Sequence, residues 1–356
     1  MRDPFPFECP NWLIALVTPT CQRLGLYTLP YHIHEVIFAA SFYTFVQKVV
    51  SPWLSPKLFP NHYPQHSART RFNWDVHVVS FVQSVLVCTM ALYEMAYDEE
   101  RKEMDWQERA WGYTGGTGLI EAFGCGYFLW DLIVTALNYS MYGFGTLAHA
   151  LSAITVYGFG FRPFVNYYAP DFILYELSSP FLNIHWFCDK LNKTGSTVQL
   201  INGIFLLTSF FLARLVWGTY ASFSISRDCL MAFRFHQKGL HHITPIISPN
   251  NVMTYAAQRE APLWLVASFS LSNTTLNILN WYWFRQMVST IRKRFPAPWG
   301  TMKVEEKTKE EPIKVEMSTG YENGHKSLEV DATHVRKRPQ VERTTTGKSD
   351  AGPSFT

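Results

Sequence analysis

The sequence predicts an all-α protein, a polytopic membrane bundle of six or seven transmembrane helices. Apolar runs recur that are close to the roughly 20 residues a helix needs to cross a bilayer. Aromatic residues, 16% of the chain, gather near the ends of these runs, as is usual at membrane interfaces. The mean hydropathy of −0.04 hides this pattern, because a long polar segment at the C-terminal end lowers the average.

The composition divides the chain into three parts. Residues 1–28 form an N-terminal pre-membrane segment, residues 29–290 a transmembrane domain, and residues 291–356 a charged C-terminal tail. The tail is rich in Lys, Glu and Thr and nearly free of aromatic residues. It cannot bury enough apolar surface to order itself, so we expect it to be disordered.

Seven candidate spans follow one another in the middle part. The fifth is interrupted by a proline at Ser178-Ser179-Pro180, and a basic loop from Arg227 to Arg259 follows the sixth. Lys and Arg are shared evenly between the two sides, and only Arg292-Lys293-Arg294 favours a cytosolic tail. The expected spans cover residues 29–50, 75–96, 115–137, 146–161, 171–188, 198–223 and 262–288.

Charge and cysteine content exclude several classes of protein. The net charge of +3 gives no reason to expect a nucleic-acid partner, and the six cysteines contain no CxxC pair. We therefore expect no disulfide framework and no metal site. His32, His34 and Glu35 stand at the start of the first span, where anchoring to the interface is the default interpretation.

Two acids lie inside the third span, Glu121 and Asp131. A charge in the middle of a membrane costs on the order of 2.5–3.5 kcal/mol, so such residues face the protein interior or mark a functional site. Asp131 could orient a catalytic histidine or bind a lipid headgroup. It could instead be a structural acid that is paired with Arg214 or capped by hydroxyl or indole donors of Tyr or Trp, and the sequence favours this structural interpretation.

Other polar residues share helix faces inside the spans. His149 could act as a general base or be a hydrogen-bonded histidine of the interior. Polar residues also recur at helical spacing in the fifth and seventh spans, where they could line a cavity or join helices. These two stripes are Glu176, Ser179 and Asn183, and Asn273, Asn277 and Asn280.

Five local patterns follow one another along the spans. They are Trp74-Asp75-Val76-His77-Val78-Val79-Ser80, Gly126-Tyr127-Phe128-Leu129-Trp130-Asp131-Leu132, His149-Ala150-Leu151-Ser152, Leu174-Tyr175-Glu176-Leu177-Ser178-Ser179-Pro180-Phe181-Leu182-Asn183, and Leu279-Asn280-Trp281-Tyr282-Trp283-Phe284. In this order and spacing they resemble the TLC-domain family, which includes ceramide synthases and translocation-associated membrane proteins. The resemblance covers roughly residues 35–290 and is greatest to the small TLC-domain-containing branch.

The chain departs from the ceramide synthases at the positions tied to acyl transfer. Their tandem histidines match Ala148-His149 here, and their Leu-His-Asp type motif matches Leu174-Tyr175-Glu176. Many family members also carry a histidine near the position of Gln83. The resemblance therefore implies a membrane protein of lipid homeostasis that lacks part of the acyltransferase machinery.

Three functions stay open at this point, with residence in the endoplasmic reticulum implied by the resemblance alone. The first is binding or sensing of a membrane lipid in a polar cavity, without a cofactor. The second is an N-acyltransferase that uses acyl-CoA as co-substrate, with His149 as base and Asp131 or Glu176 orienting it. The third is a trafficking receptor whose basic loop and tail engage cytosolic partners. The residues expected to line the lipid cavity are Asp131, His149, Glu176, Asn183, Arg214 and Asn277.

Overall fold

A computed structural model describes residues 3–240, 252–256 and 259–292, and within these residues the chain is helical with no strand. The all-α prediction is therefore confirmed. The predicted tail, from residue 293 onward, and part of the predicted basic loop lie outside the described residues. The longer helices are α1 (Asn11–Leu24), α2 (Leu29–Phe45), α4 (Ala68–Tyr97), α7 (Gly115–Leu137), α8 (Tyr139–Gly160), α10 (Ser179–Lys190), α11 (Thr197–Phe210), α12 (Gly218–Gln237) and α13 (Leu263–Arg292). The short ones are α3 (Ser51–Leu58), α5 (Glu99–Lys102), α6 (Trp106–Trp111) and α9 (Ala169–Ile173).

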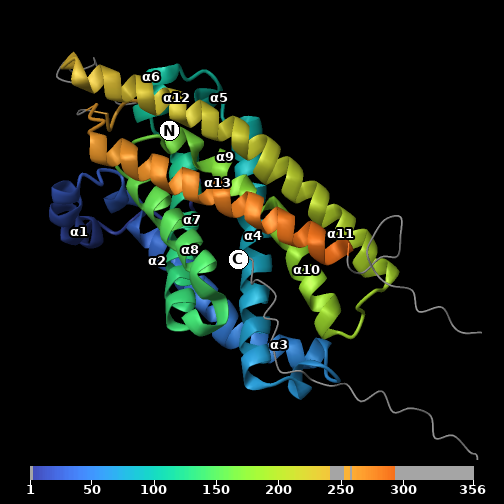
Figure 1. Cartoon of the computed structure of the whole chain (residues 1–356). Helices are drawn as coiled ribbons and strands as arrows, with labels where there is room; N and C mark the ends of the chain where they lie inside the picture. The colour runs from blue at the N-terminus through green and yellow to red at the C-terminus, as the bar shows by residue number, and fades with distance from the viewer. Residues whose placement is uncertain (1–2, 241–251, 257–258, 293–356) are drawn as a thin grey trace, which may run out of the picture.

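The helices form one bundle in which α7 is central. It packs most extensively on α2 and α8, and α4 lies against both α7 and α10. Figure 1 shows α13 crossing α8 and running beside α12, and these pairs are in contact. The site described below lies where α8, α12 and α13 meet the segment from α9 to α10.

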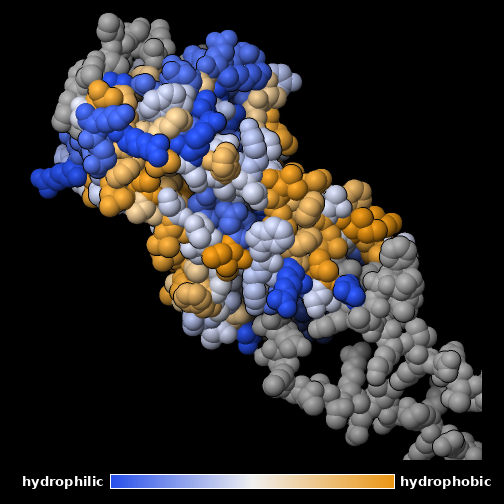
Figure 2. All heavy atoms as spheres, turned by 45° about the horizontal axis from the view of Figure 1, so that its top comes forward, coloured by the Kyte–Doolittle hydropathy of each residue, from blue (hydrophilic) through white to orange (hydrophobic). Residues whose placement is uncertain are grey.

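Three stretches of the described chain are both long and apolar enough to cross a membrane: Ala68–Tyr97, Trp106–Leu137 and Thr197–Gln237. The 23 residues of α7 extend roughly 35 Å at the α-helical rise, which exceeds a hydrocarbon core of about 30 Å. Figure 2 shows hydrophilic atoms gathered at the end that carries α5 and α6, and hydrophobic atoms over much of the face below. The chain is thus a membrane protein, while six or seven spans stay a prediction.

The sixth predicted span is longer than expected. The candidate span Thr197–Gln237 has 41 residues and joins α11 to α12 through a π-helical segment, η5 (Phe211–Trp217). The prediction of a loop from Arg227 is therefore wrong for residues 227–237. The helix continues because fully buried Asp228 accepts hydrogen bonds from Arg109 Nε and the Tyr168 hydroxyl, both at 2.7 Å, which docks α12 beside α6.

The predicted fifth span is broken as expected. The chain runs through α9, a 3₁₀ segment η4 (Leu174–Ser178) and then α10. Pro180 lies in the first turn of α10, where its missing N–H has no helical partner to lose. The break exposes backbone carbonyls of η4 to side chains of neighbouring helices, and one of them becomes part of the site.

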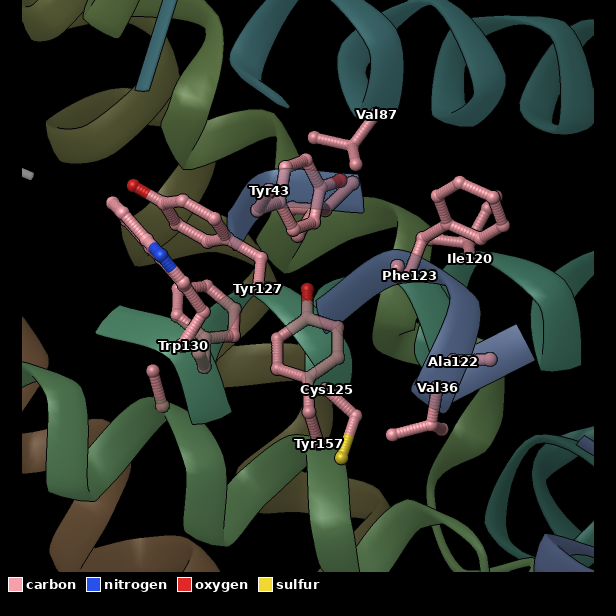
Figure 3. Close-up of a cluster of buried hydrophobic side chains, with 14 of the residues drawn as sticks. Val36, Tyr43, Val87, Ile120, Ala122, Phe123, Cys125, Tyr127, Trp130 and Tyr157 are labelled. Atoms are coloured by element: carbon pink, nitrogen blue, oxygen red, sulfur yellow. The ribbon is translucent and has the colours of Figure 1, made fainter. Parts of the chain in front are cut away.

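The main apolar core lies between α2, α4, α7 and α8 (Figure 3). Gly126 allows α2 and α7 to approach, because a Cβ there would lie 2.7 Å from the Ala39 Cβ and 2.8 Å from the Val36 carbonyl oxygen. The rings of Tyr43 and Tyr127 pack edge to face at 5.4 Å. The start of the Gly126–Leu132 motif therefore serves helix packing.

Candidate functional site

A buried ion pair joins η4 to the π-helical segment η5. Arg214, 3% exposed, places Nη2 3.5 Å from Oε1 of Glu176, which is 2% exposed. The Ser179 hydroxyl donates to Oε2 of the same carboxylate at 2.7 Å. A guanidinium is a good partner for a buried carboxylate, because it offers several donors in a fixed plane.

The remaining donors of Arg214 are also directed to acceptors. Nε donates to the Tyr175 carbonyl oxygen at 2.8 Å, and Nη1 lies 3.4 Å from Oδ1 of Asn280. The carbonyl is accessible because η4 is 3₁₀ rather than α-helical, and π-helical segments such as η5 often occur at functional sites. Glu176 and Arg214, both predicted to line the site, are thus brought together, and Asn280 joins them.

A small internal cavity of about 40 Å³ adjoins this ion pair. It has room for roughly two or three water molecules or a group of similar size. Asn273 and Leu276 of α13 are half-exposed, so the wall of the cavity reaches the outer face of the bundle. The cavity is lined by Phe128, His149, Ala153, Val156, Tyr157, Phe172, Tyr175, Glu176, Ile225, Phe269, Asn273 and Leu276.

His149 lines this cavity with an unsatisfied imidazole. It is 4% exposed, and within the described residues neither ring nitrogen has a hydrogen-bond partner. The rings of Trp283 at 5.5 Å and Phe128 at 6.2 Å hold it edge to face. Because buried polar groups in proteins are nearly always hydrogen-bonded, such an imidazole points to water or a ligand in the cavity.

Asn183 belongs to a second polar group, between α4 and α10. Its Oδ1 lies 2.7 Å from Nδ1 of His77, and its Nδ2 donates to the Ser80 hydroxyl at 3.0 Å. The His77 ring stacks on Trp186 at a centroid distance of 4.2 Å. The sequence placed His77 and Ser80 in a family pattern but not in the site, and only the fold pairs them with Asn183.

Asp131 lies apart from the cavity. It is 1% exposed, and the Thr135 hydroxyl, one helical turn on, lies 3.5 Å from its Oδ1. The residues found to line the described cavity do not include Asp131. A direct role of Asp131 in orienting His149 therefore stays a prediction.

Asn277 joins two helices instead of entering the cavity. Its amide donates to the Ser222 hydroxyl of α12 at 2.9 Å and to Oδ1 of Asn273 at 3.0 Å. Ser222 in turn donates to Asn273 Oδ1 at 2.9 Å. Of the three asparagines, Asn273 lines the cavity and Asn280 contacts Arg214 of the ion pair. The stripe therefore contributes to helix packing, to the cavity and to the ion pair.

Two further residues of the family patterns have clear environments. Gln83, where many family members have histidine, is fully buried, and neither amide atom has a hydrogen-bond partner within the described residues. Asp75 accepts hydrogen bonds from Ser51 at 2.6 Å and from Tyr63 at 3.1 Å. Burial and the nearby Asp75 raise the pKa of Tyr63, which lies between the spans, to about 12. The Trp74-Asp75 pattern therefore fastens the α3–α4 connection.

An apolar helical bundle with buried ion pairs and a small interior cavity defines a polytopic α-helical membrane protein. The sequence matches the TLC domain family over residues 73–289. The chain belongs to this family, whose members are generally membrane proteins linked to lipid metabolism, and the predicted resemblance is confirmed.

Relatives extend the match beyond the domain. A TLC domain-containing protein of Schizosaccharomyces pombe is 37% identical over 287 residues, which cover 80% of this chain and 87% of the relative. Topoisomerase I damage affected protein 4 of Saccharomyces cerevisiae is 28% identical over 280 residues, 77% and 89% of the two chains. Human TLC domain-containing protein 4 is 31% identical over 180 residues, 49% and 66% of the two chains.

Proposed function

We propose that the protein binds a membrane lipid, with the polar part of the lipid in the cavity beside His149 and Glu176. The observation that carries this proposal is the unsatisfied imidazole of His149 in the cavity wall. A hydroxyl or amide of a lipid headgroup could both donate to and accept from such a ring.

The size of the cavity limits how such a lipid is placed. A volume of about 40 Å³ accepts a small polar group and not a whole acyl chain. The chains would lie between α8 and α13 and reach the bilayer past half-exposed Asn273 and Leu276. This arrangement suits binding or sensing of a membrane lipid, and we propose the endoplasmic reticulum as its location.

Lipid bound to the purified protein tests this proposal. Full-length protein in mild detergent is analysed by native mass spectrometry, and the extracted lipids are quantified. Ala153→Leu fills the cavity and should remove the bound lipid. Leu151→Phe adds bulk to the exposed face of the same helix and should leave it. Equal lipid content in both variants and in the unaltered protein would refute the proposal.

A second candidate function is an N-acyltransferase that takes acyl-CoA as co-substrate. The same imidazole favours it, since a buried ring nitrogen without a hydrogen-bond partner within the described residues can accept a proton from an amine nucleophile. The replaced histidines at Ala148 and Tyr175 argue for the non-enzymatic function first. Asp131 would have to act on His149 from outside the cavity, which gives Glu176 the better position as the orienting acid.

Turnover separates the two functions. The protein is incubated with long-chain acyl-CoA and a sphingoid base, and the amide product is measured beside His149→Ala. Product formed by the unaltered protein and lost in the variant would replace the binding proposal with the enzymatic one. Bound lipid without product supports binding alone.

A further inference from the structure

Another buried polar group lies at the start of α2 and does not line the cavity. Asp3, His32 and Glu35 each offer a potential ligand atom, and these atoms all lie within 4.8 Å of one another. Nδ1 of His32 is 2.8 Å from Oε2 of Glu35 and 3.5 Å from Oδ2 of Asp3. His32 and Glu35 are fully buried, and the Asp3 side chain is 33% exposed.

The fold brings these residues together from two segments of the chain. His32 and Glu35 are one turn apart on α2, so they share a face. The N-terminal segment is held beside them by Phe5, whose ring packs on Phe38 at 5.7 Å and on Phe123 at 6.2 Å. Its N–H also donates to Oδ1 of Asp3 at 2.9 Å, which leaves Oδ2 towards the histidine.

Among the residues that the structure describes, this group is short of positive charge. Within the described residues, the ion pairs of Asp3 and Glu35 are with histidines, and no hydrogen-bond donor reaches Oε1 of Glu35. The nearest cationic candidate for Oε1 is His34 Nε2 at 3.7 Å, and that nitrogen also lies 2.8 Å from the Phe7 carbonyl oxygen. Two neighbouring carboxylates in an apolar setting need a shared proton or a cation.

The second ring nitrogen of His32 is already engaged. Nε2 contacts the hydroxyl of Tyr113, which precedes α7. A histidine that ligates a metal commonly donates its other N–H to an oxygen, and this fixes the tautomer with the ligating lone pair free. Nδ1 would then face the two carboxylates. The glycine at position 118 makes room for this ring, because a Cβ there would lie 2.5 Å from Nε2.

We propose that Asp3, His32 and Glu35 bind a divalent transition metal ion, with Zn²⁺ the best fit. One imidazole and two carboxylates match the nitrogen and oxygen ligands of zinc, whereas Mg²⁺ and Ca²⁺ prefer oxygen alone. The ion fastens the N-terminal segment to α2 and leaves one position open. The sequence led to the opposite expectation, no metal, because that expectation rested on the spacing of the cysteines.

Metal content and affinity test the proposal. Full-length protein carrying a tag without histidine is stripped with a chelator, titrated with Zn²⁺ and measured by calorimetry and elemental mass spectrometry. We expect about one Zn²⁺ per chain, as for a site with three protein ligands and one open position. Asp3→Asn should abolish tight binding, and Tyr113→Phe should weaken it roughly 10–100-fold as an outer-sphere change.

A matched variant controls for loss of an acid in the same segment. Glu8 is exposed and does not belong to the group, so Glu8→Gln should keep the affinity of the unaltered protein. Asp3 lies before the first helix, so Asp3→Asn should leave the bundle folded, which circular dichroism checks. Tight Zn²⁺ binding that survives Asp3→Asn, or a stoichiometry near zero in the unaltered protein, would overturn the proposal.

Discussion

Two buried carboxylates of this protein have opposite partners. Glu176 faces a guanidinium and a hydroxyl, so its charge is compensated inside the bundle. Glu35 faces histidines and a second carboxylate, and within the described residues one of its oxygens has no donor. Burial alone therefore does not determine what a carboxylate does in this protein; its partners do. The first acid belongs to the permanent framework of the site, and the second lacks a compensating charge among these residues, which the proposed metal ion would supply.

The largest loss of stability is expected when Glu176 loses its partner Arg214. Arg214→Met leaves Glu176 buried without its partner, which should cost about 3–5 kcal/mol. Thermal unfolding in detergent measures this loss. The double variant Glu176→Met with Arg214→Met removes both charges and should recover most of it. A double variant no more stable than Arg214→Met would show that the pair is not the source of the effect.

Zinc should stabilise the protein against unfolding through Glu35, the acid without a compensating charge among the described residues, and not through Glu176. At a free Zn²⁺ concentration 100 times the dissociation constant, binding should add about 2.7 kcal/mol to the free energy of unfolding. Glu35→Gln should lose this gain and unfold at the same temperature with or without the metal. Glu176→Gln should keep the gain, because it lies outside the group. A zinc-dependent shift in Glu35→Gln would contradict the assignment.

Two glycines, Gly118 and Gly218, allow the proposed metal site and the lipid cavity to be disturbed separately. A Cβ at Gly118 would lie 2.5 Å from His32 Nε2, and one at Gly218 would lie 2.5 Å from the Tyr175 ring. Overpacking of this kind costs about 1–3 kcal/mol. Gly118→Ala should therefore weaken zinc binding and spare lipid, whereas Gly218→Ala should do the reverse. Zinc binding is measured by calorimetry and bound lipid by extraction, in both variants. A variant that loses both ligands would contradict the independence of the two sites.

The smallest loss of stability is expected from removing the hydrogen bonds between α12 and α13. Asn277→Ala removes the hydrogen bonds to Ser222 and Asn273, and such interhelical bonds in membranes average about 0.6 kcal/mol. The melting temperature should fall slightly while bound lipid stays unchanged. Loss of lipid from this variant would instead place Asn277 in the binding site.

Apolar runs and proline positions were sufficient to predict the helical bundle and the break before α10. The site was predictable only in part. Glu176 and Arg214 stand out as charges in apolar runs, but the carbonyl of Tyr175 is offered by local 3₁₀ geometry that spacing does not reveal. Helical spacing predicted that Asn183 shares a helix face with Glu176. Because η4 is a 3₁₀ segment, that spacing does not apply across it, and Asn183 contacts His77 instead.

The group at Asp3 could not be found from spacing at all. Its third member joins through packing of Phe5 on α2 and α7, a tertiary contact between segments distant in the chain. The helix of Arg227–Gln237 was missed for a related reason. Its charged residues indicated a loop, whereas Arg109 and Tyr168 compensate Asp228 within the fold.

Photo-crosslinking of a lipid in a native membrane tests the central claim, lipid binding beside His149, most directly. A lipid with a photoreactive group next to its polar end is added, and labelled peptides are identified by mass spectrometry. We predict labels on the cavity segments of α8, η4 and α13, near Val156, Glu176 and Leu276, and their loss in Ala153→Leu. Labels confined to outward residues such as Leu151 and Leu271, and unchanged by Ala153→Leu, would contradict the claim.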